Sequence, residues 1–245
     1  MGWLDFLRKP VALELAGATD AGKSRSHNED AFGIDTVNRC AVIADGMGGL
    51  ARGEVASRLV VDSVIAAVGR GERVARALTQ AHRAIQELSA APAGERMGAT
   101  AVAVTFRGRQ AQITWMGDSR AYLFRDGKLE QLTKDHSFVQ ELIDAGAITK
   151  AEAEKHPNRN VVTRAVGIAD PEQRDPAQMR VDVRAGDRIL LCTDGLHGYL
   201  AQDKILEELR NGATAAQLPH RLIERTLNES DAGDNITVIC AQVQG

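Results

Sequence analysis

Several carboxylates of this chain stand directly beside apolar, strand-like runs, an arrangement that can hold metal ions. Asp45, Asp118 and Asp194 each end such a run, and Asp234 precedes the last one. A set of oxygen donors without a histidine or cysteine cluster suits hard ions such as magnesium or manganese rather than zinc. Two such ions about 3.5 to 4 Å apart can activate water for in-line attack on phosphorus. A single Asp-Gly pair is usually only a turn, so the hypothesis requires that these acids meet in space.

A short hairpin predicts that two further acids lie beside Asp45. Residues 35–39 join two apolar segments, and this link is too short for the crossover that parallel strands need. In an antiparallel pair the start of one strand lies beside the end of the other, so Glu29 and Asp30 should lie near Asp45. Repulsion among three carboxylates is costly unless cations or protons neutralise it. The hairpin therefore predicts a cation-binding edge.

A second antiparallel pair would bring two more acids together. If segment 188–192 pairs with segment 236–243, Asp194 and Asp234 meet at one edge of the sheet. Arg25 stands shortly before the first acids of the hairpin. An isolated arginine is most often a solvated charge, but at the edge of an acidic site its guanidinium can clamp a phosphate bidentately.

Residues 17–24 offer an alternative, because they fit the P-loop pattern G-x-x-x-x-G-K-[ST] at every specified position. A P-loop holds phosphates with the amides and dipole of the helix that follows it. Residues 25–35 show no apolar repeat at helical spacing and contain a glycine, so that helix is not predicted. A P-loop nucleotide hydrolase using residues 17–24 is therefore the weaker hypothesis.

The elements that must position these acids can be read from the apolar periodicity. Amphipathic helices are predicted at 52–68, 74–88, 203–209 and 215–227. Strands are predicted at 11–16, 31–34, 40–44, 99–106, 110–116, 121–124, 129–132, 161–162, 179–183, 188–192 and 236–243. This order favours an α+β fold with antiparallel sheets flanked by helices over a regular βαβ alternation.

The chain is predicted to be a single domain over residues 1–245, with a small flap insertion. Residues 137–160 change character, with two short helical patterns and a polar stretch between strands, and this segment is the predicted flap. No repeat, low-complexity tract or linker divides the rest. A length of 245 residues also suits one domain with a substantial core.

Composition limits the classes of partner and the cellular location. A hydrophobic content of 44% and a charged content of 26% are those of a soluble globular protein. A net charge of -3 gives no reason to expect nucleic acid or an anionic membrane as a partner. No apolar stretch is long enough to span a bilayer, and residues 1–10 do not form a signal-peptide core, so a cytoplasmic location is predicted. Cys40, Cys192 and Cys240 lie in or beside apolar runs and are predicted to be buried free thiols.

Eight short motifs, spread in order from about residue 17 to residue 243, together resemble the metal-dependent serine/threonine protein phosphatases, the PPM or type 2C family, and its bacterial members in particular. They are Arg25-Ser26-His27-Asn28-Glu29-Asp30, Ala44-Asp45-Gly46-Met47-Gly48-Gly49, Gly98-Ala99-Thr100, Gly117-Asp118-Ser119-Arg120, Leu132-Thr133-Lys134-Asp135-His136-Ser137, Thr163-Arg164-Ala165-Val166-Gly167, Thr193-Asp194-Gly195 and Gly233-Asp234-Asn235-Ile236-Thr237. Each motif is short, but the set of eight in family order is highly specific.

The resemblance implies a central antiparallel β-sandwich with pairs of helices on both outer faces, in α-β-β-α layers, and a two-metal centre at one end. By that resemblance the site residues take the following roles: Asp45 bridges both ions, the Gly46 carbonyl is a further ligand, Asp194 and Asp234 hold the first ion, Glu29 and Asp30 hold the second directly or through water, Arg25 clamps the phosphate, and Asp118 with Asp194 holds a third, weaker ion beside the flap. The implied ions are manganese or magnesium.

One departure from the family pattern concerns the proton donor. Many eukaryotic relatives carry a histidine directly after the Asp-Gly pair, and many bacterial ones carry it after Gly-Gly, where this chain has Met47 and Leu50. A general acid is therefore not assigned. His27, His136 and His197 stand in candidate segments, although a histidine in such a place is more often a hydrogen-bonding residue than a catalyst.

The predicted function is hydrolysis of phosphoserine and phosphothreonine in proteins by a metal-bridging hydroxide. A catalytically silent phosphoprotein-binding module on the same fold is the other alternative, beside the P-loop hydrolase. By resemblance the partners are phosphorylated proteins, a cognate bacterial serine/threonine kinase and the substrates of that kinase.

Overall fold

The computed structural model describes residues 11–47, 52–90, 96–168 and 175–244. Strands of these residues form two five-stranded sheets in which every pair is antiparallel. The first sheet has the order β1 (Leu13–Asp20), β10 (Ile236–Val243), β9 (Arg188–Cys192), β6 (Arg120–Arg125) and β7 (Lys128–Gln131). The second has the order β2 (Asp30–Asp35), β3 (Cys40–Asp45), β4 (Ala101–Arg107), β5 (Gln110–Met116) and β8 (Ala177–Asp182).

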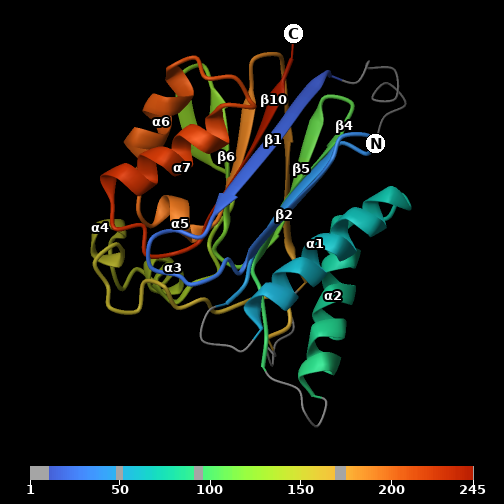
Figure 1. The fold of residues 1–245 in the computed structure, drawn as a ribbon, viewed down its shortest axis with the longest axis vertical. Helices are drawn as coiled ribbons and strands as arrows, with labels where there is room; N and C mark the ends of the chain where they lie inside the picture. Colours follow the sequence, from blue (N-terminus) through green and yellow to red (C-terminus); the bar gives the residue numbers. More distant parts are fainter. Residues whose placement is uncertain (1–10, 48–51, 91–95, 169–174, 245) are drawn as a thin grey trace.

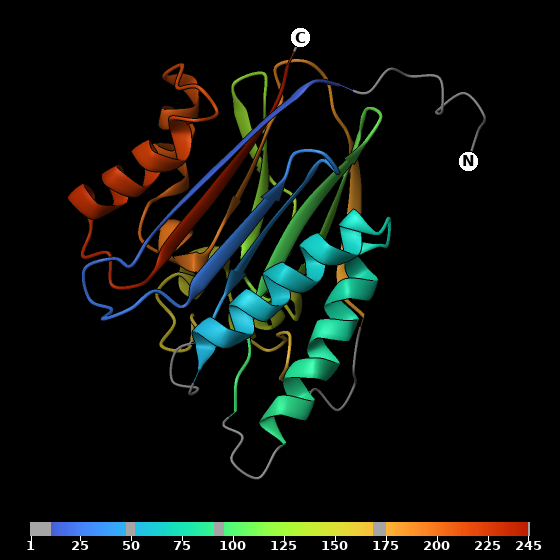
Figure 2. The ribbon, with the colours of Figure 1, turned by 45° about the vertical axis from the view of Figure 1, so that its right-hand side comes forward.

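Helices cover the outer faces of the two sheets (Figures 1 and 2). On the second sheet lie α1 (Gly53–Gly69) and α2 (Val74–Ser89), and on the first lie α5 (Asp194–His197), α6 (Gln202–Arg210) and α7 (Leu218–Glu229). The remaining helices, α3 (Phe138–Asp144) and α4 (Lys150–Ala153), lie in the segment predicted as a flap. The predicted α+β class, an antiparallel sandwich flanked by helices, is confirmed.

Alternation along β3 shows how the sequence builds these layers. Cys40, Val42 and Ala44 pack beneath α1 and α2, whereas Ala41 and Ile43 face the other sheet, and all five are fully buried. Successive side chains of a strand point to opposite faces, so an unbroken apolar run fits a strand that is covered on both sides. β3 is such a strand, and its last residue is Asp45.

The two predicted antiparallel pairs are present in the register that the site requires. Asp30 is the direct partner of Asp45 in the β2–β3 hairpin, so these acids lie opposite each other. β9 pairs with β10, which places Asp194 and Asp234 at the same end of the neighbouring sheet. In Figure 1 this is the lower end of the sandwich, where α5 lies beside the connection between β1 and β2.

Two predictions about strands were wrong because a distant partner decides the local structure, and one short helix was missed. Residues 161–162 form no strand, because Val162 makes only an isolated bridge to Ser137 where the predicted flap leaves and rejoins the fold. β1 continues past residue 16 to Asp20, because β10 pairs with it along its whole length. The four-residue helix α5 was not predicted at all.

The P-loop alternative finds no support in this fold. Residues 17–20 belong to β1, and residues 21–29 form turns and bends rather than a helix. The Lys23 ammonium donates to the backbone carbonyl of Ser230, 3.0 Å away. The helix whose N-terminus would hold phosphate is therefore missing from the described part of the chain. Among the same residues, none of the helices combines the length and apolar character that crossing a bilayer requires.

Candidate metal centre

All five predicted aspartates converge at one end of the sandwich. They are Asp30 at the start of β2, Asp45 at the end of β3, Asp118 just after β5, Asp194 at the start of α5 and Asp234 just before β10. Burial raises the pKa of Asp45 well above its ordinary value, and the charges of the other four raise it further. The structure therefore brings together acids that lie as far apart in the sequence as Asp30 and Asp234.

Three of the aspartates around Asp45 also have raised pKa values. Burial raises the pKa of Asp30 to about 7, and the charges of Asp194 and Asp234 add to the effect. Burial raises the pKa of Asp118 to about 8 and that of Asp194 to about 6, again with help from neighbouring aspartates. Folding thus holds several carboxyl groups where their ionised forms repel one another.

This donor set fits hard divalent cations. All its members offer oxygen atoms, which magnesium and manganese prefer. Asp30 Oδ1 is buried and accepts no hydrogen bond from the residues the structure describes, so it is a free ligand atom. Cations bound here would relieve both the repulsion and the missing hydrogen bond.

Gly46 brings the end of β3 into close contact with its surroundings. Its amide donates to the Glu29 carbonyl at 3.1 Å. A Cβ at Gly46 would stand 2.4 Å from the carbonyl oxygen of Gly53 and 2.6 Å from that of Glu29, closer than atoms can approach. Only glycine therefore fits at the position whose carbonyl is the predicted ligand.

Glu29 lies beside this glycine, and its side chain faces a group that the sequence analysis did not identify. It is only 8% exposed, and its amide donates to Asn235 Oδ1 at 2.8 Å. The carboxylates of Glu29 and Glu54 and the His27 ring lie within 4.8 Å of one another, with His27 Nε2 3.6 Å from Glu29 Oε1. Glu54 belongs to the first turn of α1, directly after Gly53, and no sequence pattern marked it as part of the site.

Arg25 lies at the mouth of the site. Its Nη2 donates to Asp234 Oδ2 at 2.9 Å, and the two side chains are 39% and 27% exposed. The structure thus places this guanidinium next to one of the predicted metal ligands, with part of its surface open to solvent. Guanidinium groups pair bidentately with phosphate, so this position suits the predicted clamp.

Asn235 fastens the loop that carries Arg25, a role the sequence analysis missed. Its Oδ1 accepts from the Glu29 amide, and its Nδ2 donates to the carbonyls of Ala21 and His27 at 2.9 and 3.1 Å. One buried side chain therefore ties the β1–β2 connection to the start of β10. The polar Asp234-Asn235 pair directly before an apolar strand was the available signal.

Two of the three candidate histidines are held in structural roles. His136 Nδ1 accepts from the Gly117 amide at 3.0 Å, and burial together with the Arg164 charge lowers the pKa of His136 to about 4. His197 Nε2 lies 3.1 Å from the Asp118 carbonyl oxygen, and burial lowers the His197 pKa well below its ordinary value. A carbonyl can only accept, so His197 Nε2 donates there. His27, with its side chain 62% exposed, is the candidate that faces solvent.

Met47 and Leu50 stand where relatives carry the histidine that could donate a proton, and only Met47 lies within the described residues. Met47 is half-buried, and its amide donates to the Gly98 carbonyl at 3.1 Å. Leu50 lies outside the described residues. The thioether of Met47 cannot supply a proton, so the general acid is not found at that position.

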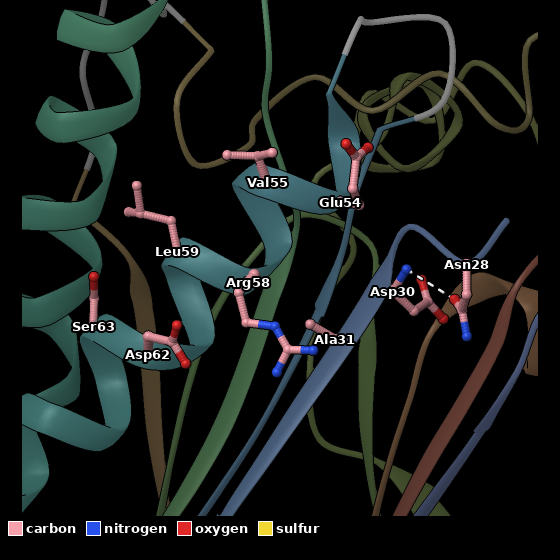
Figure 3. Close-up of a pocket in the computed structure, with 9 residues that line it drawn as sticks. All are labelled: Asn28, Asp30, Ala31, Glu54, Val55, Arg58, Leu59, Asp62 and Ser63. Carbon is pink, nitrogen blue, oxygen red and sulfur yellow. Dashed lines mark hydrogen bonds between the residues drawn. The ribbon is translucent and has the colours of Figure 1, made fainter.

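An open groove adjoins the acidic cluster (Figure 3). It has a volume of about 570 Å³, with Asn28 and Asp30 on one side and side chains of α1 on the other. Glu54, Arg58 and Asp62 line its α1 side. The groove gives solvent-accessible space directly beside the candidate metal centre.

Raising the pH is expected to destabilise the metal-free protein. The folded pKa values of Asp194, Asp30 and Asp118, about 6, 7 and 8, all lie above the ordinary aspartate value of 3.8. From pH 3.8 up to these folded values, the folded chain binds more protons than the unfolded chain. The free energy of unfolding is therefore highest at low pH and falls as the pH rises through the folded pKa values. Urea unfolding in chelator should give a lower midpoint at pH 8 than at pH 5. Manganese should remove the difference, and a midpoint that rises with pH in chelator would contradict the assignment.

Comparison with known sequences identifies relatives that match nearly the whole of this chain. The chain is 39% identical over 244 residues to the serine/threonine protein phosphatase PstP of Mycobacterium tuberculosis, covering 96% of this chain and 46% of PstP. It therefore spans about half the length of that relative. It is also 34% identical over 239 residues to the protein phosphatase PhpP of Streptococcus pneumoniae, covering 92% of this chain and 96% of PhpP.

The crystal structure of the catalytic domain of PstP in complex with two manganese ions matches the fold with a TM-score of 0.83. The two chains are 37% identical, and the match covers 95% of this chain and 99% of the other. The sequence model of the family Protein phosphatase 2C matches residues 19–235. This chain belongs to the protein phosphatase 2C family.

Proposed function

We propose that this chain is a metal-dependent protein phosphatase that hydrolyses phosphoserine and phosphothreonine in proteins. The observation that carries the proposal is the convergence of four aspartates on Asp45. Burial and the charges of these neighbours raise the pKa of Asp45 well above its ordinary value. Such a cluster is costly for folding unless it binds cations. The relatives are named as phosphatases, which favours an active enzyme over a catalytically silent phosphoprotein-binding module.

The proposed ions are two manganese or magnesium ions, as in the manganese complex of PstP, with a weaker third. The residues proposed to hold them are Asp45 for both ions, the Gly46 carbonyl as a further ligand, Asp194 and Asp234 for the first ion, Glu29 and Asp30 for the second directly or through water, and Asp118 with Asp194 for the third. When bound, such ions activate water for attack on phosphorus and offset the charge of the phosphate.

The chain's own residues bind and orient the substrate around those ions. The Arg25 guanidinium presents its N–H donors at the mouth of the cluster, and its bond to Asp234 fixes its position before substrate arrives. The groove along α1 leaves room beside the phosphate position for the polypeptide that carries it. Asn235 holds the Arg25 loop against the metal ligands.

Replacing Arg25 with alanine should lower kcat/KM for a phosphothreonine peptide by about 10- to 100-fold, because a charge-assisted hydrogen bond contributes about 1.5 to 3 kcal/mol. Lys23→Ala is the matched control, since Lys23 is a cation two residues away that binds the Ser230 carbonyl. Steady-state kinetics of both variants checks the prediction. Equal losses of kcat/KM in Arg25→Ala and Lys23→Ala would contradict a phosphate-clamping role for Arg25.

The finer parts of the proposal concern partners, location and the flap. We propose that the substrates are phosphorylated by a cognate bacterial serine/threonine kinase and that the protein works in the cytoplasm. We also propose that the chain is one domain in which residues 137–160 act as a flap. The Phe138 amide donates to the Val161 carbonyl at 2.9 Å, so this segment leaves and rejoins the fold at one place, which supports the flap.

Release of inorganic phosphate tests the function. Purified protein with manganese should hydrolyse a phosphothreonine peptide and leave ATP intact. Hydrolysis of ATP that is lost in Lys23→Ala would support the P-loop alternative instead. Tight manganese binding without hydrolysis of any phosphopeptide would favour the silent module.

A further inference from the structure

The two carboxylate oxygens of Asp30 have different surroundings. Oδ2 accepts hydrogen bonds from the Thr193 hydroxyl at 2.9 Å and from the Thr237 hydroxyl at 2.7 Å. Oδ1 is buried and accepts none from the residues that the structure describes. Asp30 is 9% exposed, and both threonines are fully buried. The carboxylate is thus held by one oxygen and free at the other.

The direction of the hydrogen bonds around Thr237 is fixed by its single hydroxyl proton. Thr237 donates that proton to Asp30, so in its 2.7 Å contact with Thr19 it must accept. Thr19 therefore donates to Thr237 and accepts from Asn28 Nδ2 at 2.8 Å. The bonds all run toward the carboxylate of Asp30.

The same hydrogen bonds form a ring that returns to the backbone amide of Asp30, and they connect the two sheets. The Asp30 amide donates to Asn28 Oδ1 at 3.0 Å, which completes a ring through Thr19 and Thr237. The Thr193 hydroxyl accepts a hydrogen bond from the Thr237 amide at 3.0 Å and donates its own proton to Asp30. A β2 residue of one sheet is thereby fixed by β1 and β10 of the other.

We propose that Thr193 and Thr237 are positioning residues of the metal centre, which bind Oδ2 of Asp30 so that Oδ1 alone faces the ion. This inference rests on the proposed metal-dependent function. Groups that orient a metal ligand typically change metal affinity or activity by about 10- to 100-fold when removed. Without the hydroxyls the carboxylate can turn, and Oδ2 loses the donors that satisfy it in a buried place.

Manganese binding to the metal-free protein, measured by calorimetry without substrate, tests the proposal. Thr237→Val keeps the shape of the side chain and removes the hydroxyl, and we expect the manganese dissociation constant to rise about 10-fold or more. Thr237→Ser restores a donor and should bind within about threefold of wild type, as conservative rescue requires. Thr193→Val removes the other donor and serves as the second variant, with the same expected direction.

Thr226→Val is the matched control. Thr226 is also fully buried, but its hydroxyl donates to the Leu222 carbonyl within α7, away from the aspartates. This variant should lose stability to urea and keep wild-type manganese affinity. Wild-type affinity in both Thr237→Val and Thr193→Val would overturn the proposal, as would an equal loss of affinity in Thr226→Val. Because no substrate is present, absent phosphatase activity would refute the proposed function without altering this result.

Discussion

Asp194→Asn is expected to reduce manganese-dependent phosphate release by at least about 100-fold. Removing a group that only orients a metal ligand costs up to about 100-fold, and removing a ligand itself should cost no less. Asp194 is proposed to hold two ions, and its charge is among those that raise the pKa of Asp45. Asparagine has the same shape but lacks the negative charge and one acceptor oxygen, so it is a poor ligand for a hard cation. Kinetics on a phosphothreonine peptide at saturating manganese checks the loss.

The stability of the same variant separates a lost ligand from a lost fold. In the metal-free protein Asp194→Asn removes one of several repelling carboxylates, so at pH 8 it should unfold at higher urea than wild type. Asp182→Asn, an exposed aspartate of the edge strand β8, is the control and should change neither activity nor stability. An inactive variant that is also less stable in chelator would contradict the account.

Gly195→Ala is expected to cost about 1 to 3 kcal/mol of stability, as overpacked sites do, and to weaken manganese binding. A Cβ at Gly195 would lie 1.9 Å from the backbone carbonyl oxygen of Asn235, which cannot rotate away. α5 must therefore move from the start of β10, and Asp194 must move from Asp234. In a chain of this size each kcal/mol lowers the melting temperature by about 2 to 4 °C.

A glycine with free space around it provides the control for this substitution. An added Cβ at Gly69, in the last turn of α1, meets no atom within 4 Å. Gly69→Ala should therefore keep wild-type manganese affinity and be as stable as wild type or about 0.4 to 1 kcal/mol more stable. Calorimetry with and without manganese measures both variants. Wild-type melting and binding in Gly195→Ala would show that the contact between α5 and β10 does not position the acids.

The sequence alone was sufficient for the parts of the site that depend on strand period and link length. The short link at 35–39 predicts the hairpin, and the hairpin places Asp30 opposite Asp45. The expected pairing of segments 188–192 and 236–243 brings Asp194 and Asp234 to one edge, because antiparallel pairing places the end of one strand beside the start of its partner. The place of Asp118 in the site was implied only by the family resemblance. The roles of these residues were implied by the family resemblance and stay proposals.

The parts that could not be predicted depend on contacts between segments far apart in the chain. Thr193 and Thr237 bond to Asp30 across 163 and 207 residues, and nothing local marks either hydroxyl as a partner of a carboxylate. β1 extends to Asp20 only because β10 offers a partner there. The strand expected at 161–162 has apolar residues but only an isolated bridge to pair with.

The most direct test of the central claim is phosphate release from a phosphothreonine peptide as manganese is titrated into the metal-free protein. We predict no release in chelator, a rise in rate as manganese is added, and loss of that rate when chelator is returned. Asp45→Asn, measured beside wild type, should stay inactive across the titration. Full activity in chelator, or wild-type activity in Asp45→Asn, would contradict a metal centre built on this cluster.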